Sequence, residues 1–211
     1  MTQTPLPLVC LILAAGQSQR LGRNKCELRI QNKPLLVHTV LKACSIAPTY
    51  VALGCYAESN HRILQQYCSS ASALFCQRWS HGMGATIAES VQQLPTSEGV
   101  LIFLADQYAV SKRDLKQLVR VWRGAPDQQA CAKYDNGLGV PAIFPASRLP
   151  NLLQIDPSAG AKSLLDPKRT QTLDMPNAAL DIDTPQDYAD LATNVVDGGL
   201  SPNKGAKHAH P

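Results

Sequence analysis

The chain has 211 residues, of which 45% are hydrophobic and 17% are charged, and its formal net charge is +4. This composition excludes a chain that is disordered throughout and is typical of one globular domain, which we place at residues 1–197. The modest net charge gives no reason to expect nucleic acid as a partner. The positively charged residues cluster locally, which suits an anionic small molecule better than a long polyanion.

The sequence carries no membrane or secretion signal. No apolar run approaches the roughly 20 residues that cross a bilayer, and no secretory leader pattern is present, so we expect a cytoplasmic protein without a membrane partner. The seven cysteines are scattered and form no C-x-x-C pair, which favours reduced thiols in the core.

Strand-like and helix-like segments alternate from residue 8 to residue 122. The run 100–105 is the most apolar of the strands, and Ser111 stands where it can cap the next helix. This repeated order favours a three-layer α/β/α fold, Rossmann-like, with a mostly parallel sheet and right-handed crossovers. The expected strands are 8–13, 50–54, 72–76 and 100–105, and the expected helices are 34–44, 58–68, 84–94 and 111–122.

The pattern changes after Gly124. Asn136 and Gly137 between apolar segments predict a β-hairpin, which we interpret as a small extension over the site. Pro141 argues against the second arm as a central strand. We expect short helices at 146–155 and 159–165, a last helix that begins at Pro185 with a Thr184 cap, and a disordered tail at 198–211.

A basic, glycine-containing loop follows the first predicted strand, with the sequence LAAGQSQRLGRNK at residues 13–25. Glycines let backbone N–H groups approach a polyphosphate, and Arg20, Arg23 and Lys25 add positive charge. The loop lacks both the Walker A pattern and G-x-G-x-x-G, so neither of those site classes applies. In open α/β sheets ligands bind at the carboxyl ends of the strands, and we expect this loop and Asp106 to lie close together there.

The pattern L-A-A-G-x-S-x-R-x-G-x-x-K resembles the signature of the MobA-like nucleotidyltransferases. Within that family it is most similar to the molybdenum cofactor cytidylyltransferases, because Ala15 stands where the guanylyltransferase branch typically has glycine. Further motifs follow in the family's order: HGMG at 81–84, LADQ at 104–107, GVPAIF at 139–144, AGAK at 159–162 and DIDTP at 181–185.

The resemblance implies transfer of CMP from CTP to the molybdenum cofactor, with release of pyrophosphate and a recipient molybdoenzyme as a further partner. Such a reaction needs its reactants positioned and its growing negative charge neutralised. Arg20 offers a planar fork for the outer phosphates and Lys25 a compact charge for the α-phosphate, so we take both as catalytic. The expected nucleotide-binding residues are Leu13, Ala14, Ala15, Gly16, Gln17, Ser18, Lys25, Gly82, Met83, Thr86 and Asp106.

Carboxylates at two motifs are the candidate ligands of Mg²⁺, which prefers oxygen. Asp106 directly follows the most apolar strand, and Asp181 and Asp183 alternate on one side of an extended segment. By the family pattern Asp106 and Asp183 hold the metal, and Asp181 lies with Lys162 on the acceptor side.

Two departures from the family pattern leave alternatives open. Tyr108 replaces the usual proline after the LADQ motif, and Ser158 replaces an aspartate before the AGAK motif. The alternatives are guanylyl or other NTP transfer to a different phosphorylated acceptor, or a non-catalytic carrier of the molybdenum cofactor.

Overall fold

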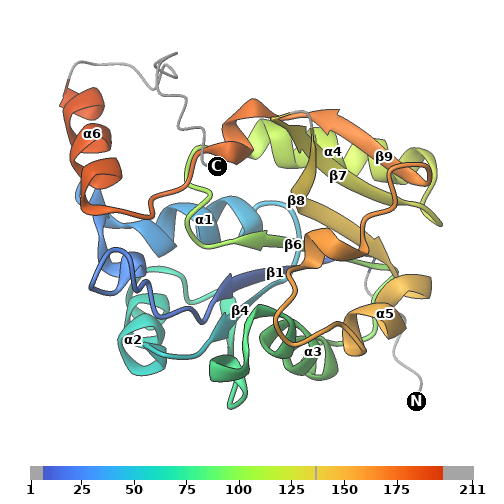
Figure 1. The fold of residues 1–211 in the computed structure, drawn as a ribbon, viewed down its shortest axis with the longest axis horizontal. Helices are drawn as coiled ribbons and strands as arrows, with labels where there is room; N and C mark the ends of the chain where they lie inside the picture. Colours follow the sequence, from blue (N-terminus) through green and yellow to red (C-terminus); the bar gives the residue numbers. More distant parts are fainter. Residues whose placement is uncertain (1–6, 136, 197–211) are drawn as a thin grey trace.

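A seven-stranded sheet forms the centre of the protein in the computed structural model, which describes residues 7–135 and 137–196 (Figure 1). The strand order is β5-β4-β1-β6-β8-β7-β9. β5, β4, β1 and β6 run parallel, β8 is antiparallel to both its neighbours, and β9 is parallel to β7. The strands are β1 (Val9–Ala14), β4 (Thr49–Leu53), β5 (Ala71–Phe75), β6 (Gly99–Leu104), β7 (Gln129–Tyr134), β8 (Gly137–Pro145) and β9 (Thr170–Asp174).

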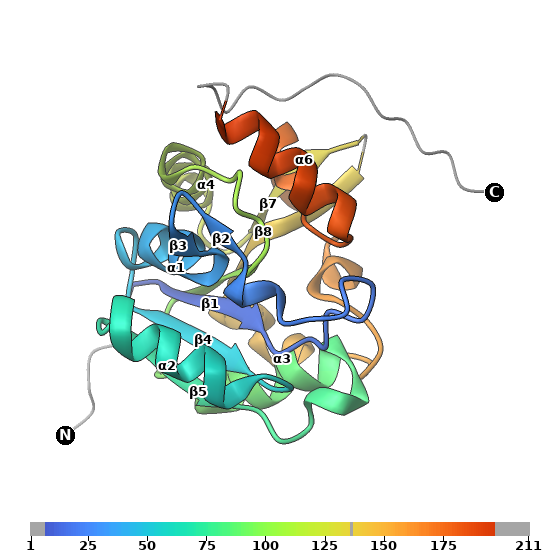
Figure 2. The ribbon, with the colours of Figure 1, turned by 90° about the vertical axis from the view of Figure 1, so that its left-hand side faces the viewer.

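Helices cover both faces of this sheet, as Figure 2 shows. The helices are α1 (Leu35–Cys44), α2 (Ala57–Tyr67), α3 (Met83–Gln93), α4 (Lys112–Gly124), α5 (Leu149–Leu153) and α6 (Pro185–Val196). Alternate residues of β1 enter two separate cores. Cys10 and Ile12 pack with α1, α2 and α4, whereas Leu11 and Leu13 pack with α3 and α5. The expected three-layer α/β/α architecture with a mostly parallel sheet is confirmed.

The predicted hairpin forms, but its arms are strands β7 and β8 of the main sheet. Asn136 lies outside the described residues. The expectation that Pro141 keeps the second arm out of the sheet centre is wrong, because β8 lies between β6 and β7. The ladder with β6 ends at Ala142, and the ladder with β7 jumps from Ala142 to Gly139, so Pro141 needs to donate no ladder hydrogen bond.

A separate two-stranded sheet, β2 (Arg29–Ile30) with β3 (Lys33–Pro34), joins the basic loop to α1. A short 3-10 helix, η1 (Lys25–Glu27), precedes it. The small sheet and α6 share a third apolar cluster that includes Leu28, Ile30, Ile182 and Leu191. The C-terminal helix is therefore anchored beside the basic loop.

Both predicted helix caps are confirmed. Ser111 forms a capping box with Asp114 at the start of α4. α6 begins at Pro185, where the Thr184 hydroxyl accepts a hydrogen bond from the Asp187 N–H at 3.2 Å. The expected tail at 198–211 lies outside the described residues. Within the described ranges no helix is both long and apolar enough to cross a membrane.

Candidate active site

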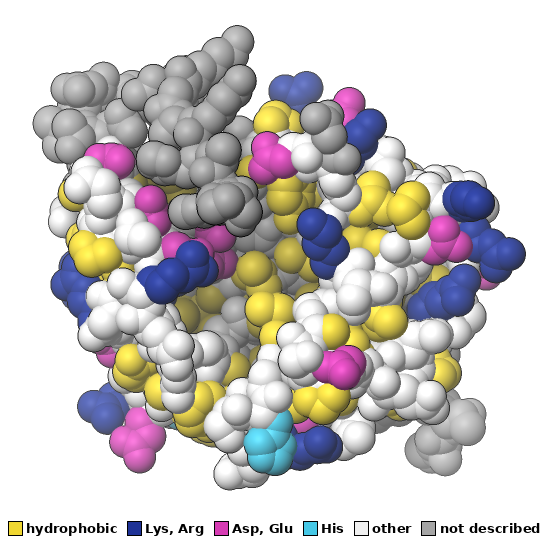
Figure 3. Space-filling view, viewed as in Figure 1, with side chains coloured by type: hydrophobic (Ala, Val, Ile, Leu, Met, Phe, Trp, Pro, Cys, Tyr) yellow, Lys and Arg dark blue, Asp and Glu magenta, His cyan; other side chains and the backbone are white. Residues whose placement is uncertain are grey.

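A cavity of about 600 Å³ opens at the carboxyl ends of β1 and β6, and Figure 3 shows this face of the molecule hollowed. Leu13 and Leu104 are direct neighbours in the parallel β1–β6 ladder, so the segments that follow them leave the sheet side by side. The lining residues are Leu13, Ala14, Ala15, Gly16, Gln17, Ser18, Gln19, Arg20, Lys25, Cys26, Leu35, Trp79, Ser80, Gly82, Met83, Thr86, Leu104, Ala105, Asp106, Asp181 and Asp183.

Three carboxylates converge in this cavity. One oxygen each of Asp106, Asp181 and Asp183 lies within 4.8 Å of the others. Asp181 and Asp183 share one side of an extended segment because Ile182 between them is buried in the opposite direction, at 1% exposure. Burial, followed by the charges of Asp183 and Asp106, raises the pKa of Asp181 above its usual value. The cluster offers the oxygen donors that a hard divalent cation prefers.

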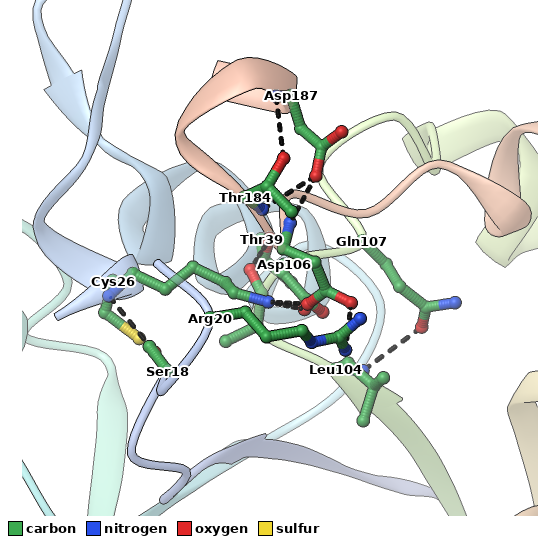
Figure 4. A network of polar contacts seen from close by, with 12 residues as sticks. Ser18, Arg20, Cys26, Thr39, Leu104, Asp106, Gln107, Thr184 and Asp187 are labelled. Atoms are coloured by element: carbon green, nitrogen blue, oxygen red, sulfur yellow. Dashed lines mark hydrogen bonds and ion pairs between the residues drawn. The ribbon is translucent and has the colours of Figure 1, made fainter. Parts of the chain in front are cut away.

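Two cations of the basic loop pair with these carboxylates. Lys25 Nζ lies 2.7 Å from Asp106 Oδ2 and 2.6 Å from Asp183 Oδ1. Arg20 forms an ion pair with the other oxygen of Asp183. Figure 4 shows the side chains of Arg20 and Asp106 converging below the cap formed by Thr184 and Asp187. Burial lowers the pKa of Lys25, but the two carboxylates outweigh it and raise the pKa, so the amine is an ammonium.

The backbone of Lys25 is held by a buried asparagine. Asn24 caps η1 by accepting a hydrogen bond from the Cys26 N–H, and its amide donates to Ser59 and Asn60 of α2. The Lys25 N–H donates to Ser18 Oγ at 3.3 Å, which ties the lysine to the glycine-containing loop. The side chain is thus fixed at its base.

Hydrogen bonds to neighbouring elements hold the turn that carries Asp106 in place. On α1, the Thr39 hydroxyl donates to the Ala105 carbonyl at 2.9 Å, and the Lys42 ammonium donates to the carbonyls of Tyr108 and Val110. Gln107, 2% exposed, accepts from the Leu104 N–H and donates to the carbonyls of Val140 and Ala178. Sequence reasoning missed Thr39 and Lys42, although a single lysine within a largely apolar helix was a usable signal.

The loop at 82–84 packs directly on residues 156–158. Gly82 has φ +120°, and a Cβ there would lie 2.3 Å from the Pro157 carbonyl oxygen. The Gly84 N–H donates to that same carbonyl at 2.9 Å. Thr86 is buried, and its hydroxyl donates to the Gly82 carbonyl at 3.2 Å. These glycines therefore shape the cavity wall, and Gly82, Met83 and Thr86 line the cavity.

Lys162 is the one predicted site residue that does not line the cavity. It lies exposed on a 3-10 helix, η4 (Ala161–Leu164), and its ammonium is near Gly137 of the hairpin. Ser158, at the position of the expected aspartate, donates to the carboxylate of Asp156 through both its N–H and its hydroxyl. Sequence reasoning also missed part of the lining: Gln19, Cys26, Leu35, Trp79, Ser80, Leu104 and Ala105.

A family model described as the MobA-like NTP transferase domain matches residues 10–173. The chain belongs to this family. The match covers β1 with its basic loop and Asp106, and it ends before Asp181 and Asp183. In this MobA-like NTP transferase the last two carboxylates therefore come from a segment outside the matched domain.

Individual proteins similar to this chain cover most of its length. Purine catabolism protein PucB of Bacillus subtilis (strain 168) is 26% identical over 203 residues, which are 86% of this chain and 94% of PucB. The solved structure of the Rv0371c homologue of Mycobacterium sp. strain JC1 is 25% identical, with a TM-score of 0.72 over 90% of this chain and 97% of that chain. A manganese complex of Rv0371c from Mycobacterium tuberculosis H37Rv is 20% identical, with a TM-score of 0.70 over 88% and 97% of the two chains, and shows the fold alone.

Proposed function

We propose that the protein transfers CMP from CTP to the molybdenum cofactor and releases pyrophosphate. A phosphate oxygen of the acceptor forms a bond to the α-phosphorus of CTP, and the bond from that phosphorus to the β-phosphate oxygen breaks. The observation that carries the proposal is the meeting of three carboxylates and two cations beside the loop 15–18, inside a cavity large enough for a nucleotide.

Each residue has a role that suits this reaction. The backbone N–H groups of residues 15–18 would hold the phosphates. Arg20, whose side chain is 74% exposed, is free to reach the outer phosphates, and Lys25 stabilises charge that builds at the α-phosphate. Gly82, Met83 and Thr86 would face the base and ribose. No covalent enzyme intermediate is needed.

The acidic cluster fits a divalent cation, and we propose Mg²⁺. Three carboxylates with oxygens within 4.8 Å of one another are a suitable donor set, and Asp106 and Asp183 are the ligands we propose. When bound, the ion would neutralise phosphate charge as the pyrophosphate leaves. A manganese complex exists for one relative of the same fold. We assign Asp181, the exposed member of the cluster, to the acceptor side.

The acceptor assignment rests on the family resemblance, the choice of CTP rests on Ala15, and alternatives remain. One is guanylyl or other NTP transfer to a different phosphorylated acceptor. Another is a carrier that binds the molybdenum cofactor without catalysis, with transfer to a recipient molybdoenzyme. Lys162 reaches an acceptor only if the acceptor extends beyond the cavity toward the hairpin, because it does not line the cavity itself.

The test is pyrophosphate release from CTP, GTP, ATP and UTP, each with Mg²⁺ and molybdenum-loaded pterin. We expect release with CTP above all. Release with GTP only would replace the cytidylyl assignment with a guanylyl one. Tight cofactor binding without release from any NTP would favour the carrier. Omission of the acceptor is the control, since hydrolysis of the NTP alone also yields pyrophosphate with some enzymes.

A further inference from the structure

Lys25 occupies the place between two of the proposed metal ligands. Its ammonium contacts Asp106 and Asp183 at 2.7 and 2.6 Å, and the Lys25 and Asp106 side chains are only 15% and 14% exposed. Arg20 contacts the remaining oxygen of Asp183. Asp106 Oδ2 and both carboxylate oxygens of Asp183 are therefore already engaged by two protein cations.

A divalent cation that entered this arrangement would be repelled by the two protein cations and would meet much less net negative charge than three free carboxylates offer. Two of the three carboxylate charges are already balanced by Lys25 and Arg20. Unlike charges at these distances attract strongly in a half-buried site, and an added dication beside an ammonium is repelled by the same law. The free protein is consequently a poor metal site, although it has a suitable set of oxygens.

The phosphates of a nucleotide offer Lys25 another partner. The Lys25 N–H donates to Ser18 Oγ, so the lysine stem begins beside the loop proposed to hold the triphosphate. Its backbone is fixed by Asn24 and η1, whereas its four-carbon stem can rotate. A triphosphate bound at residues 15–18 would attract the ammonium away from Asp106 and Asp183, and would attract Arg20 in the same way.

We propose that Lys25, assisted by Arg20, couples metal binding to nucleotide binding: without NTP the two cations hold the carboxylates, and the metal enters only with the NTP. This inference rests on the proposed function. It adds an order of binding to the site, and it gives Lys25 a second role before chemistry begins. The coupling also keeps the cluster from taking up a divalent cation when no substrate is present.

Direct Mn²⁺ binding without nucleotide tests the inference, by calorimetry or by loss of the free Mn²⁺ EPR signal. We expect weak binding by the wild type and binding about tenfold tighter or more by Lys25→Met. Lys25→Arg retains the cation and should stay weak. Arg62→Met is the control, because it also removes one positive charge, but from an exposed position on α2 where Arg62 pairs with Glu58 and does not line the cavity. Equal affinity of Lys25→Met and Arg62→Met would overturn the coupling.

Arg20→Met keeps the test decisive if Lys25→Met fails to fold. Arg20 is largely exposed, so its loss should spare the fold, and we expect Mn²⁺ binding severalfold tighter than in Arg62→Met. No gain in Arg20→Met would also count against the inference.

A non-hydrolysable CTP analogue separates this inference from the proposed function. Suppose that, in the presence of the analogue, the wild type binds Mn²⁺ and Asp106→Asn does not. The metal site is then supported, and the Mn²⁺ affinity of Lys25→Met without nucleotide decides the coupling. If Mn²⁺ does not bind even with the analogue, or binds Asp106→Asn as well as wild type, both the metal site and the coupling fail.

Discussion

The Lys25 ammonium lies 2.7 Å from the Asp106 carboxylate, although 81 residues separate the two in the sequence. The contact follows from the parallel pairing of β1 with β6, which brings the segments after both strands to one edge of the sheet. Asp183 joins them from the segment before α6, so one charged cluster ties three distant parts of the chain together.

Asp106→Asn should lower turnover about a hundredfold or more while the protein stays folded. The amide retains the shape of the carboxylate but loses the charge that a divalent cation and Lys25 require. Initial rates of pyrophosphate release, with circular dichroism to verify folding, measure the effect. Asp174→Asn at the end of β9 is the control, because Asp174 is exposed and does not line the cavity. Wild-type turnover in Asp106→Asn would remove this residue from the metal site.

Lys42 should make the free energy of unfolding depend on pH. Burial lowers the pKa of Lys42 to about 8, and the charge of Asp114 only partly opposes this. Between pH 8 and the ordinary value of 10.5 the unfolded chain binds more protons than the folded one, so stability rises with pH across that window. Over this pH window the unfolding free energy of the wild type should rise, relative to that of Lys42→Met, by about 2–3 kcal/mol at most.

Urea unfolding of the wild type and Lys42→Met between pH 7 and 10.5 measures that gain. Groups whose pKa is raised by burial, such as Tyr108 and Cys131, are present in both proteins, so their contributions cancel in the difference between the two curves. A difference that stays constant with pH would show that Lys42 does not lose its proton more easily in the folded state.

Gly84→Ala should destabilise the protein by about 2–4 kcal/mol. The added Cβ would lie 2.0 Å from the Asp156 carbonyl oxygen, and backbone on both sides leaves little room to relax. The same shift would displace the cavity wall and raise the KM for NTP. Gly124→Ala is the matched control, since its Cβ would meet open space at the end of α4. We expect it to change the unfolding free energy by about 0.5 kcal/mol or less, and similar losses in both variants would refute the packing argument.

Tyr188 should anchor α6, and with it Asp183, to the basic loop. Its hydroxyl donates to the Arg29 carbonyl at 3.0 Å, and the Arg23 guanidinium lies 5.4 Å from the ring centroid. Tyr188→Phe should cost about 0.5–1 kcal/mol, and Tyr188→Ala more, because the ring contact is lost as well. Hydrogen exchange of the α6 amides should speed up in that order, and unchanged exchange in Tyr188→Ala would contradict the anchoring.

Much of the first half of the fold could be predicted because its signals are local. Continuous apolar runs identify β1 and β6, and Ser111 marks the start of α4 with its own hydrogen bonds. The rule that ligands bind at the carboxyl ends of parallel strands then predicts that the basic loop and Asp106 meet. The central place of β8 was not predictable, because a register jump that spares Pro141 depends on pairing with two other strands.

The sequence by itself determined the α/β fold, the basic, glycine-containing loop and the acidic motifs, because each depends on residues that are neighbours along the chain. Only the tertiary structure decided that Lys25 lies between Asp106 and Asp183, that Lys42 fastens the turn carrying Asp106, and that Lys162 lies outside the cavity. Those outcomes depend on distances between segments far apart in sequence. Ion pairing and burial vary steeply with such distances, and no local pattern encodes them.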